Sequence, residues 1–323
     1  HYTNWSKCKD AEIVAICDTN PNIVEDSKKA AGNIEGAAQE IDFDKLKIYS
    51  DYEKMLSDGI VDAVSITLPT YMHRDFTVKA LEAGVHVLCE KPMALDADQC
   101  RQMAEAAEKS GKVLQIGHCI RFWPEYEKTK QIIESGEYGE VKSAVFRRLG
   151  AAPTWGAEDW FAQEERSGGV ALDLHIHDAD YIQYLFGMPK SVRSFGYPAS
   201  GKGLKHITSR YDFGDDKLVT AEGSWEISPT FGFEMSFNIV LEKATLVFDC
   251  TREPMFKICP NEGEVFTPEI AEGDGYSREI EHFAAAVAGK DVPEIINPTQ
   301  SINSIKLVKA EVESVKKQSD IKV

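Results

Sequence analysis

The chain has 323 residues, 43% of them apolar, and a formal net charge of −17. This length exceeds what one small core usually organises, so we expect two domains. The acidic balance argues against a nucleic-acid partner, because such binding needs a positive surface. No apolar run has the length of a membrane-spanning helix and no secretory signal is visible, so we expect no membrane association.

The seven cysteines are scattered along the chain and form no Cys-x-x-Cys pair. This pattern is typical of reduced, mostly buried thiols rather than of a disulfide framework or a zinc site. We therefore expect a cytoplasmic protein.

An apolar segment at residues 12–17 predicts a strand that ends at Asp18. An acid that closes the second strand of a dinucleotide-binding unit typically accepts hydrogen bonds from the ribose hydroxyls of the cofactor. The glycine-rich loop of such a unit lies about 20 residues earlier, which here is before His1. We expect the first strand and the glycine loop to precede His1. The alternative is that Asp18 is only a turn residue.

Strands and helices then alternate up to about residue 120. Helices are predicted at 21–31, 52–57, 73–83 and 96–109, and strands at 46–49, 61–68, 87–89 and 113–116. Gly84 is the expected end of its helix. This alternation predicts an α/β dinucleotide-binding domain at residues 1–120, with a Rossmann-type doubly wound parallel sheet.

Residues 121–323 differ in character and form the second predicted domain. Strands are expected at 141–149, 192–197, 207–213, 218–227, 234–241 and 245–249. Short turns such as 213–216 join some of them, which favours a large open antiparallel sheet in an α+β domain. Helices are predicted at 124–135, at 174–186 and in the tail 277–317, with a break near 289–298.

Glu90, Lys91 and Pro92 follow the buried apolar segment 87–89. Proline cannot continue a central strand, so the chain must turn here. Glu90 and Lys91 then lie at the carboxyl edge of a parallel sheet, where ligands of open α/β folds bind. A half-desolvated lysine at this edge can donate a hydrogen bond to a substrate oxygen. The alternative is a surface salt bridge.

A second stretch, residues 167–178, has two glycines followed by a predicted helix. Asp173 and His177 are four residues apart and therefore share one face of that helix. A carboxylate one turn from a histidine fixes its tautomer and raises its basicity, which suits a general base near neutral pH. The alternative is a capped helix with buried histidines.

The same stretch contains four side chains of metal-ligand type: Asp173, His175, His177 and Asp178. On a helix they spread around the axis, because residues two apart are separated by about 200°. Shared coordination is therefore disfavoured, and we predict no metal site.

In their order and spacing these motifs resemble the Gfo/Idh/MocA family, which is named for glucose–fructose oxidoreductase, inositol dehydrogenase and a rhizopine catabolism protein. The resemblance rests on Glu90-Lys91-Pro92 and on the later Gly-Gly-x3-Asp-x3-His. Three other stretches are similar to family segments: the loop 68–73, the interdomain link 117–126 and the late helix 276–283. The likeness covers nearly the whole chain.

The resemblance implies an enzyme that oxidises a secondary hydroxyl of a sugar, cyclitol or polyol with NAD or NADP. Lys91, Asp173 and His177 match the family's catalytic lysine, aspartate and histidine. By this likeness His177 is the base, Lys91 holds the same oxygen, and Asp173 orients His177 or grips a neighbouring hydroxyl. The family also implies a cis Lys91-Pro92 bond, C-terminal helices that pack back, and a homodimer or homotetramer formed through the open sheet.

The expected cofactor contacts are Asp18, Thr67, Leu68, Pro69, Thr70, His73, Glu90 and Lys91. The expected substrate contacts are Lys91, Arg121, Trp160, Asp173, His177 and Tyr276. Tyr126 is a further residue expected to border the pocket, and Trp155, Phe161 and Trp225 are candidates for a sugar-stacking wall with Trp160, although aromatic residues more often belong to a core. No arginine directly follows Asp18 to meet a 2′-phosphate, so NAD is favoured over NADP.

Two other functions remain open. One is a glycoside-cleaving enzyme of the same fold, which keeps a bound NAD and proceeds through a 3-keto sugar with Lys91 and His177. The other is a non-catalytic regulator that senses the cofactor, and the joint presence of Lys91, Asp173 and His177 weighs against it.

Overall fold

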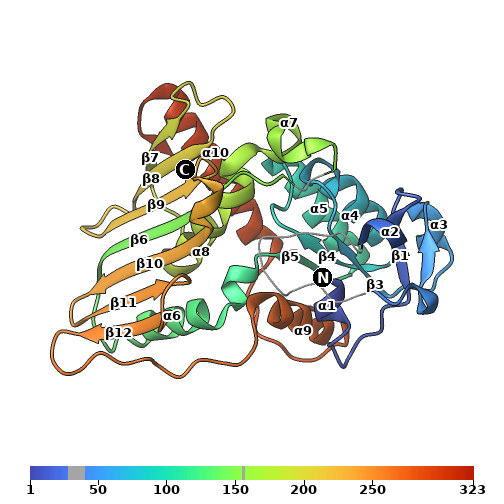
Figure 1. Ribbon diagram of the computed structural model, residues 1–323, viewed down its shortest axis with the longest axis horizontal. Coiled ribbons are helices and arrows are strands. Elements are labelled where there is room, and N and C mark those ends of the chain that lie inside the picture. Colours follow the sequence, from blue (N-terminus) through green and yellow to red (C-terminus); the bar gives the residue numbers. More distant parts are fainter. Residues whose placement is uncertain (28–40, 155–156) are drawn as a thin grey trace.

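The structure is a computed structural model that describes residues 1–27, 41–154 and 157–323. Figure 1 shows two parts: small parallel sheets with helices around them, and a large sheet beside helices α6, α8 and α10. No helix in the described ranges is both long enough and apolar enough to cross a membrane.

The first part is built on parallel strands, as predicted. β1 (Ala15–Cys17) pairs with β2 (Lys47–Tyr49). A separate sheet has the order β3-β4-β5, with β3 (Ala63–Ile66), β4 (His86–Glu90) and β5 (Leu114–Gly117). The α-helices here are α1 (Tyr2–Trp5), α2 (Ile23–Ser27), α3 (Tyr52–Ser57), α4 (His73–Glu82) and α5 (Ala97–Ser110), and the 3-10 turns are η1 (Phe43–Lys45) and η2 (Thr70–Met72).

Local signals explain where these helices begin and end. The Asp96 carboxylate accepts the backbone N–H of Asp98 and of Gln99, both at 2.9 Å, so it caps α5. Gly84 follows α4 with a φ of +80°, a conformation that glycine adopts readily, and the predicted helix end is confirmed.

The second part contains one eight-stranded sheet in the order β12-β11-β10-β6-β9-β8-β7-β13. Its strands are β6 (Val141–Gly150), β7 (Ser191–Tyr197), β8 (His206–Asp212), β9 (Leu218–Ser224), β10 (Phe233–Leu241), β11 (Ala244–Asp249), β12 (Phe256–Pro260) and β13 (Ile321–Lys322). Neighbouring strands are antiparallel except β6 and β9, which are parallel. The predicted large antiparallel sheet is confirmed, while β12 and β13 were not predicted.

Helices cover one face of this sheet. Phe146 of β6 and Phe237 of β10 contact the rings of Tyr126 and Tyr181, which belong to α6 and α8. The remaining elements are η3 (Cys119–Phe122), α6 (Pro124–Ser135), η4 (Ala157–Ala162), α7 (Glu164–Ser167), the π-helical turn η5 (Ala171–His175), α8 (Ile176–Phe186), η6 (Pro229–Phe231), α9 (Gly275–Val287) and α10 (Pro298–Lys317).

Helix α9 returns to the first part of the molecule. Its Ile280 and Phe283 pack with Leu88 of β4 in a small apolar cluster that also touches Trp5. Because Leu88 lies two residues before Glu90, this contact sets α9 beside the strand that leads to the Glu90-Lys91-Pro92 motif.

Candidate active site

The predicted cofactor residues follow the carboxyl ends of parallel strands. Asp18 comes directly after β1, residues 67–70 follow β3, and Glu90 ends β4. Asp18 is half-buried, and its Oδ1 accepts the backbone N–H of Asn20 at 2.7 Å. This edge is where ligands of open α/β sheets bind.

Lys91 and Asp173 meet across the two parts of the molecule. The Lys91 Nζ donates to the Asp173 backbone oxygen at 2.7 Å and to its Oδ1 at 3.1 Å. Both side chains are mostly buried, with 15% and 14% of their surface exposed. The Lys91-Pro92 bond is cis, as predicted.

Asp173 and His177 differ from the predicted arrangement. Residues 171–175 form a π-helical turn, and α8 begins only at Ile176. No hydrogen bond joins Asp173 to His177 in the described part of the chain, and the buried Nδ1 of His177 has no partner there. The Asp173 carboxylate instead pairs with the Lys91 ammonium, because a charge-assisted bond is stronger than one to a neutral ring.

The electrostatics of His177 also differ from the prediction. Burial is the main reason that its pKa lies well below the ordinary value, and the positive charges of Lys91 and Arg148 lower it further. The expected rise in basicity is therefore wrong. The ring is neutral near neutral pH and keeps a lone pair that can accept a proton.

Three of the four ligand-type side chains of this stretch have different partners, and the buried Nδ1 of the fourth, His177, has none within the described residues. His175 Nε2 lies 3.1 Å from Glu311 Oε2. Asp178 takes two hydrogen bonds from Arg148, at 2.9 and 3.0 Å. With Asp173 on Lys91, these side chains do not converge on one point.

His73, a predicted cofactor contact, lies inside the protein. Its Nδ1 is 2.8 Å from the Pro92 carbonyl oxygen, and its Nε2 is 2.7 Å from that of Leu68. Both ring nitrogens are thus occupied by backbone contacts. His73 ties the loop after β3 to the Lys91-Pro92 turn, and its expected contact with the cofactor stays a prediction.

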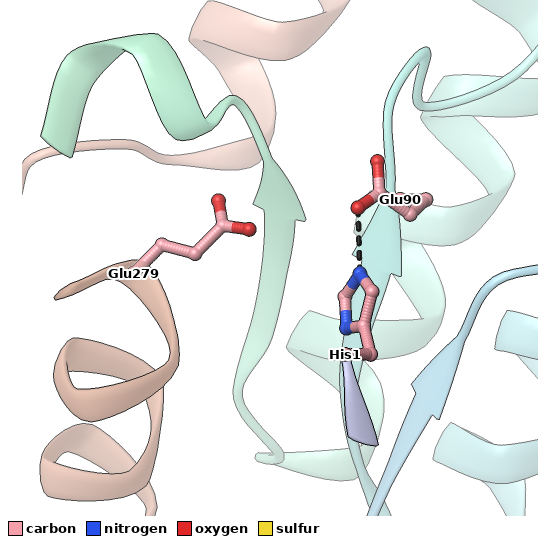
Figure 2. A group of neighbouring side chains, drawn as sticks. All are labelled: His1, Glu90 and Glu279. Atoms are coloured by element: carbon pink, nitrogen blue, oxygen red, sulfur yellow. Dashed lines mark hydrogen bonds and ion pairs between the residues drawn. The ribbon is translucent and has the colours of Figure 1, made fainter. Parts of the chain in front are cut away.

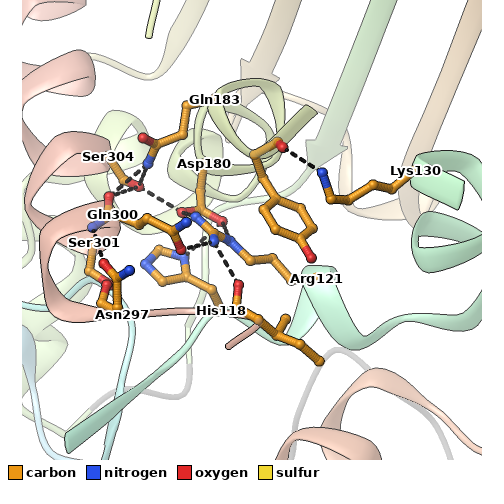
Figure 3. A network of polar contacts seen from close by, with 11 residues as sticks. His118, Arg121, Lys130, Asp180, Gln183, Asn297, Gln300, Ser301 and Ser304 are labelled. Atoms are coloured by element: carbon orange, nitrogen blue, oxygen red, sulfur yellow. Dashed lines mark hydrogen bonds and ion pairs between the residues drawn. The ribbon is translucent and has the colours of Figure 1, made fainter. Parts of the chain in front are cut away.

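Arg121, a predicted substrate contact, is buried in a polar network (Figure 3). Its Nε and Nη2 each donate to the Asp180 carboxylate at 2.8 Å, and its Nη1 donates to Gln300 Oε1 at 2.6 Å. Its guanidinium also lies over the Tyr184 ring, 4.4 Å from the centroid. Arg121 is therefore a structural clamp. Tyr126 likewise belongs to the core, where it is completely buried against Phe237.

His118 was not singled out by the sequence reasoning. It follows β5 directly, the position that matches the end of β4 on the next strand. Its Nδ1 lies 3.5 Å from Asp180 Oδ2, and its buried Nε2 has no partner within the described residues. Burial lowers its pKa to about 4, although Asp180 opposes this shift. The sequence signal that could have identified His118 is its position just after a predicted strand.

Glu279 of α9 was also missed, and Figure 2 shows it pointing toward Glu90 and His1. One ligand atom from each of these three residues lies within 4.8 Å of the others, and His1 Nε2 is 2.6 Å from Glu90 Oε1. Burial, and then the Glu90 charge, raise the pKa of Glu279 well above its usual range. Glu279 is therefore a neutral acid beside an ionised Glu90. The prediction of no metal stays a prediction.

The aromatic candidates form a partly exposed cluster. The rings of Trp160 and Phe161 stack with centroids 4.0 Å apart, and Phe161 meets Trp225 edge-on at 6.4 Å. Trp155 lies outside the described residues. Tyr276, at the start of α9, packs edge-on against Trp123 at 5.7 Å.

Comparison with known proteins places both parts of the chain. Residues 1–118 match the profile described as "Oxidoreductase family, NAD-binding Rossmann fold" and residues 126–247 match the "GFO/IDH/MocA C-terminal domain". D-glucoside 3-dehydrogenase of Escherichia coli (strain K12) is 28% identical over 316 residues, covering 90% of this chain and 85% of the relative.

One further sequence relative and one solved structure are also similar to this chain. D-xylose 1-dehydrogenase (NADP(+)) 2 of Haloferax volcanii (strain ATCC 29605) is 27% identical over 284 residues, covering 82% of each chain. The solved complex of levoglucosan dehydrogenase with NADH and levoglucosan has a TM-score of 0.81 at 20% identity, covering 100% of this chain and 95% of that one. The predicted fold is thereby confirmed, and the chain belongs to the GFO/IDH/MocA family of oxidoreductases.

Proposed function

We propose that this protein is a dehydrogenase that transfers a hydride between a secondary hydroxyl of a sugar, cyclitol or polyol and NAD. The observation that carries the proposal is the meeting of Lys91 and Asp173 across the two parts of the molecule, with His177 one turn further along. An ammonium, a carboxylate and a neutral imidazole are the groups needed to bind and deprotonate an alcohol.

In this proposal each group has one role. His177 accepts the hydroxyl proton of the substrate, a role typically worth about 10²–10⁴ in rate. Lys91 donates a hydrogen bond to the same oxygen and stabilises its developing negative charge. Asp173 holds the Lys91 ammonium in place through the 3.1 Å contact, so its role is to position Lys91 rather than His177.

The residues present fit a nicotinamide dinucleotide. Asp18 and the 67–70 loop follow parallel strands, Glu90 ends one, and the buried Nε2 of His118 at the end of the next has no partner among the residues that the structure describes. Asp18 would hold the ribose hydroxyls, and the 67–70 loop would lie along the nicotinamide half. NAD, when bound, supplies the acceptor for the hydride that leaves the carbinol carbon. Thr19 and Asn20 offer no positive charge for a 2′-phosphate, which favours NAD over NADP.

The relatives and the aromatic cluster support the proposed substrate class. The similarity to a D-glucoside 3-dehydrogenase supports a pyranoside as the first substrate to test. The partly exposed rings of Trp160 and Trp225 have the flat apolar surface on which sugar rings stack.

The test is to mix the purified protein with NAD or NADP and a panel of glucose, methyl glucosides, xylose and inositols. Nicotinamide reduction is followed by absorbance. We expect reduction with NAD, and a loss of about 10²–10³ in kcat for Lys91→Gln, which removes one donor to the oxyanion. Lys130→Gln is the control, because Lys130 is comparably buried, with 20% exposed, but donates to the Tyr184 carbonyl on α8. Undiminished turnover by Lys91→Gln would sink the proposal.

The same assay separates the two other functions. An aryl glucoside that releases its aglycone without net reduced cofactor would indicate the glycoside-cleaving reaction. Tight NAD binding with no turnover of any sugar would indicate the regulator.

We also propose that the protein assembles through the uncovered face of the large sheet. Apolar side chains that alternate with the buried ones point from this face: Val145, Phe195, Tyr197 and Leu218 are 40–63% exposed. Exposed apolar surface of this kind marks interaction sites. We expect a homodimer or homotetramer by light scattering and a smaller species for the variant that combines Phe195→Glu and Tyr197→Glu.

A further inference from the structure

The π-helical turn η5 has a buried polar anchor behind it. His175, the last residue of this turn, is completely buried. Its Nε2 lies 3.1 Å from Glu311 Oε2 on α10 and 3.3 Å from the Tyr211 hydroxyl on β8. Glu311 is also fully buried and Tyr211 nearly so.

A third element, β9, packs closely against the His175 side chain. A Cβ atom at Gly223 of β9 would lie 2.9 Å from the His175 Cβ and 3.0 Å from its Nδ1. Any side chain at position 223 would therefore push the imidazole out of its place. His175 is thus held between α10, β8 and β9, three elements of the second domain.

The anchored residue lies between the two candidate groups of the site. Asp173 is two residues before His175, and His177 is two residues after it. A π turn is rare in helices and is found mostly at functional sites, because it shifts the side chains around it relative to an α-helix. Here the turn ends at His175, so a displacement of this ring moves both neighbours.

The charges around His175 favour the ion pair. Burial lowers the pKa of the imidazole, but the Glu311 carboxylate more than offsets this, and the pKa lies above its ordinary value. Asp178 adds to the rise, while Arg148 opposes it and is itself paired with Asp178. Glu311 and Tyr211 are the other titratable groups that face the ring.

We propose that His175 and Glu311 are positioning residues: their buried contact holds the π turn so that Asp173 meets Lys91 and His177 faces the reacting hydroxyl. The inference rests on the proposed dehydrogenase function. It predicts that loss of the pair lowers turnover more than it lowers binding.

Two variants test the pair. Glu311→Gln keeps the shape of the side chain and removes its charge, and His175→Ala removes the anchor. We expect kcat to fall by about 10–100-fold, since a misplacement of about 1 Å can cost this much, while KM for the sugar and Kd for NADH change by less than about threefold. An unchanged kcat in both variants, or a rise in KM that accounts for the whole effect, would overturn the proposal.

Ser209→Ala is the matched control. Ser209 is buried on β8 and pairs with Ser194, whose N–H donates to Ser314 of α10, so the same two elements are joined without the π turn. Thermal unfolding measures the stability of each variant. We expect Ser209→Ala to lose stability but to keep kcat within about twofold.

Gly223→Ala tests the position of the His175 imidazole from the neighbouring strand β9. We expect it to lower kcat as His175→Ala does, and to have little further effect when combined with His175→Ala, because the added methyl group then fills the space of the missing ring. Additive losses in the double variant would contradict a shared route through His175.

A crystal structure of His175→Ala separates this proposal from the proposed function. If the wild-type protein oxidises no sugar, the dehydrogenase assignment fails, but the structure still decides about the anchor. A displaced 171–177 segment, with Lys91 Nζ and Asp173 Oδ1 no longer 3.1 Å apart, supports the positioning role. An unchanged segment overturns it.

Discussion

At the scale of single residues, Lys91 pairs with Asp173 and adds to the effect of burial in lowering the pKa of His177. Its ammonium is neutralised by Asp173, with which it forms a mostly buried ion pair. The same positive charge disfavours a second one on His177, whose ring is already buried. His177 is consequently a neutral acceptor, and the carboxylate that the motif places one turn away does not change this.

The pH dependence of kcat/KM tests this reading. The pKa of His177 is lowered, so the ring stays in its basic form as the pH falls through 6.5, its ordinary value, and protonates only below it. We expect the acid limb of the profile below pH 6.5. In Lys91→Gln the limb should move to higher pH, because one opposing charge is gone, while Lys130→Gln should leave it in place. A limb above pH 6.5 in the wild type would contradict the neutral, depressed histidine.

At the scale of elements, helix α9 connects the carboxyl-terminal part of the chain to the site. It carries Tyr276 and Glu279, and it packs on β4 through Ile280 and Phe283. Its first turn is stabilised by a capping box, in which Asp274 Oδ1 accepts the Ser277 N–H at 2.8 Å and Ser277 Oγ accepts the Asp274 N–H at 3.2 Å. The cap therefore fixes where the helix begins and where Glu279 lies.

Removal of this cap has a defined cost. We expect Asp274→Ala to lower the free energy of unfolding by about 1 kcal/mol, because the first-turn N–H groups lose their acceptor. Urea unfolding measures this difference. Glu281→Ala on the exposed side of the same helix is the comparison, with an expected change within about 0.5 kcal/mol. Equal effects of the two substitutions would show that the capping box adds nothing.

At the scale of the whole molecule, the polar network of Figure 3 lies where the two parts meet, because His118, which follows β5, is 3.5 Å from Asp180 Oδ2 of α8. Arg121 lies just after β5 and binds Asp180 of α8, Gln300 of α10 and the carbonyl of Ile295. The side-chain hydrogen bonds of Arg121 in the described residues all go to other segments, and the guanidinium is completely buried. The network therefore fixes the second part relative to the strand ends that form the cofactor edge.

Truncation of Arg121 tests this role. We expect Arg121→Met to lower the free energy of unfolding by about 3–5 kcal/mol, because the Asp180 charge is left buried without its partner. Adding Asp180→Asn should recover part of the loss. Unfolding midpoints measure both variants. A raised KM for the sugar with unchanged stability would instead restore Arg121 to the substrate site.

The sequence by itself determined the order of the strands and helices and the positions of the motifs. The strand and helix alternation, the antiparallel second domain, and the ends of α4 and α6 follow from local periodicity and turn residues, and these signals need no distant partner. The contact of Lys91 with Asp173 could be expected from their motifs, and the common site with His177 stays a prediction. The short edge strands β12 and β13 were not, because two to five residues carry little pattern of their own.

Only the tertiary structure decided which partner each polar group has. Asp173 pairs with Lys91, and Arg121 is buried against Asp180. His118 and Glu279 lie close to the strand ends. These outcomes depend on contacts between residues far apart in the chain. The charge state of a side chain is set by the solvent it loses and by the charges that share its space, and both exist only once the elements are packed.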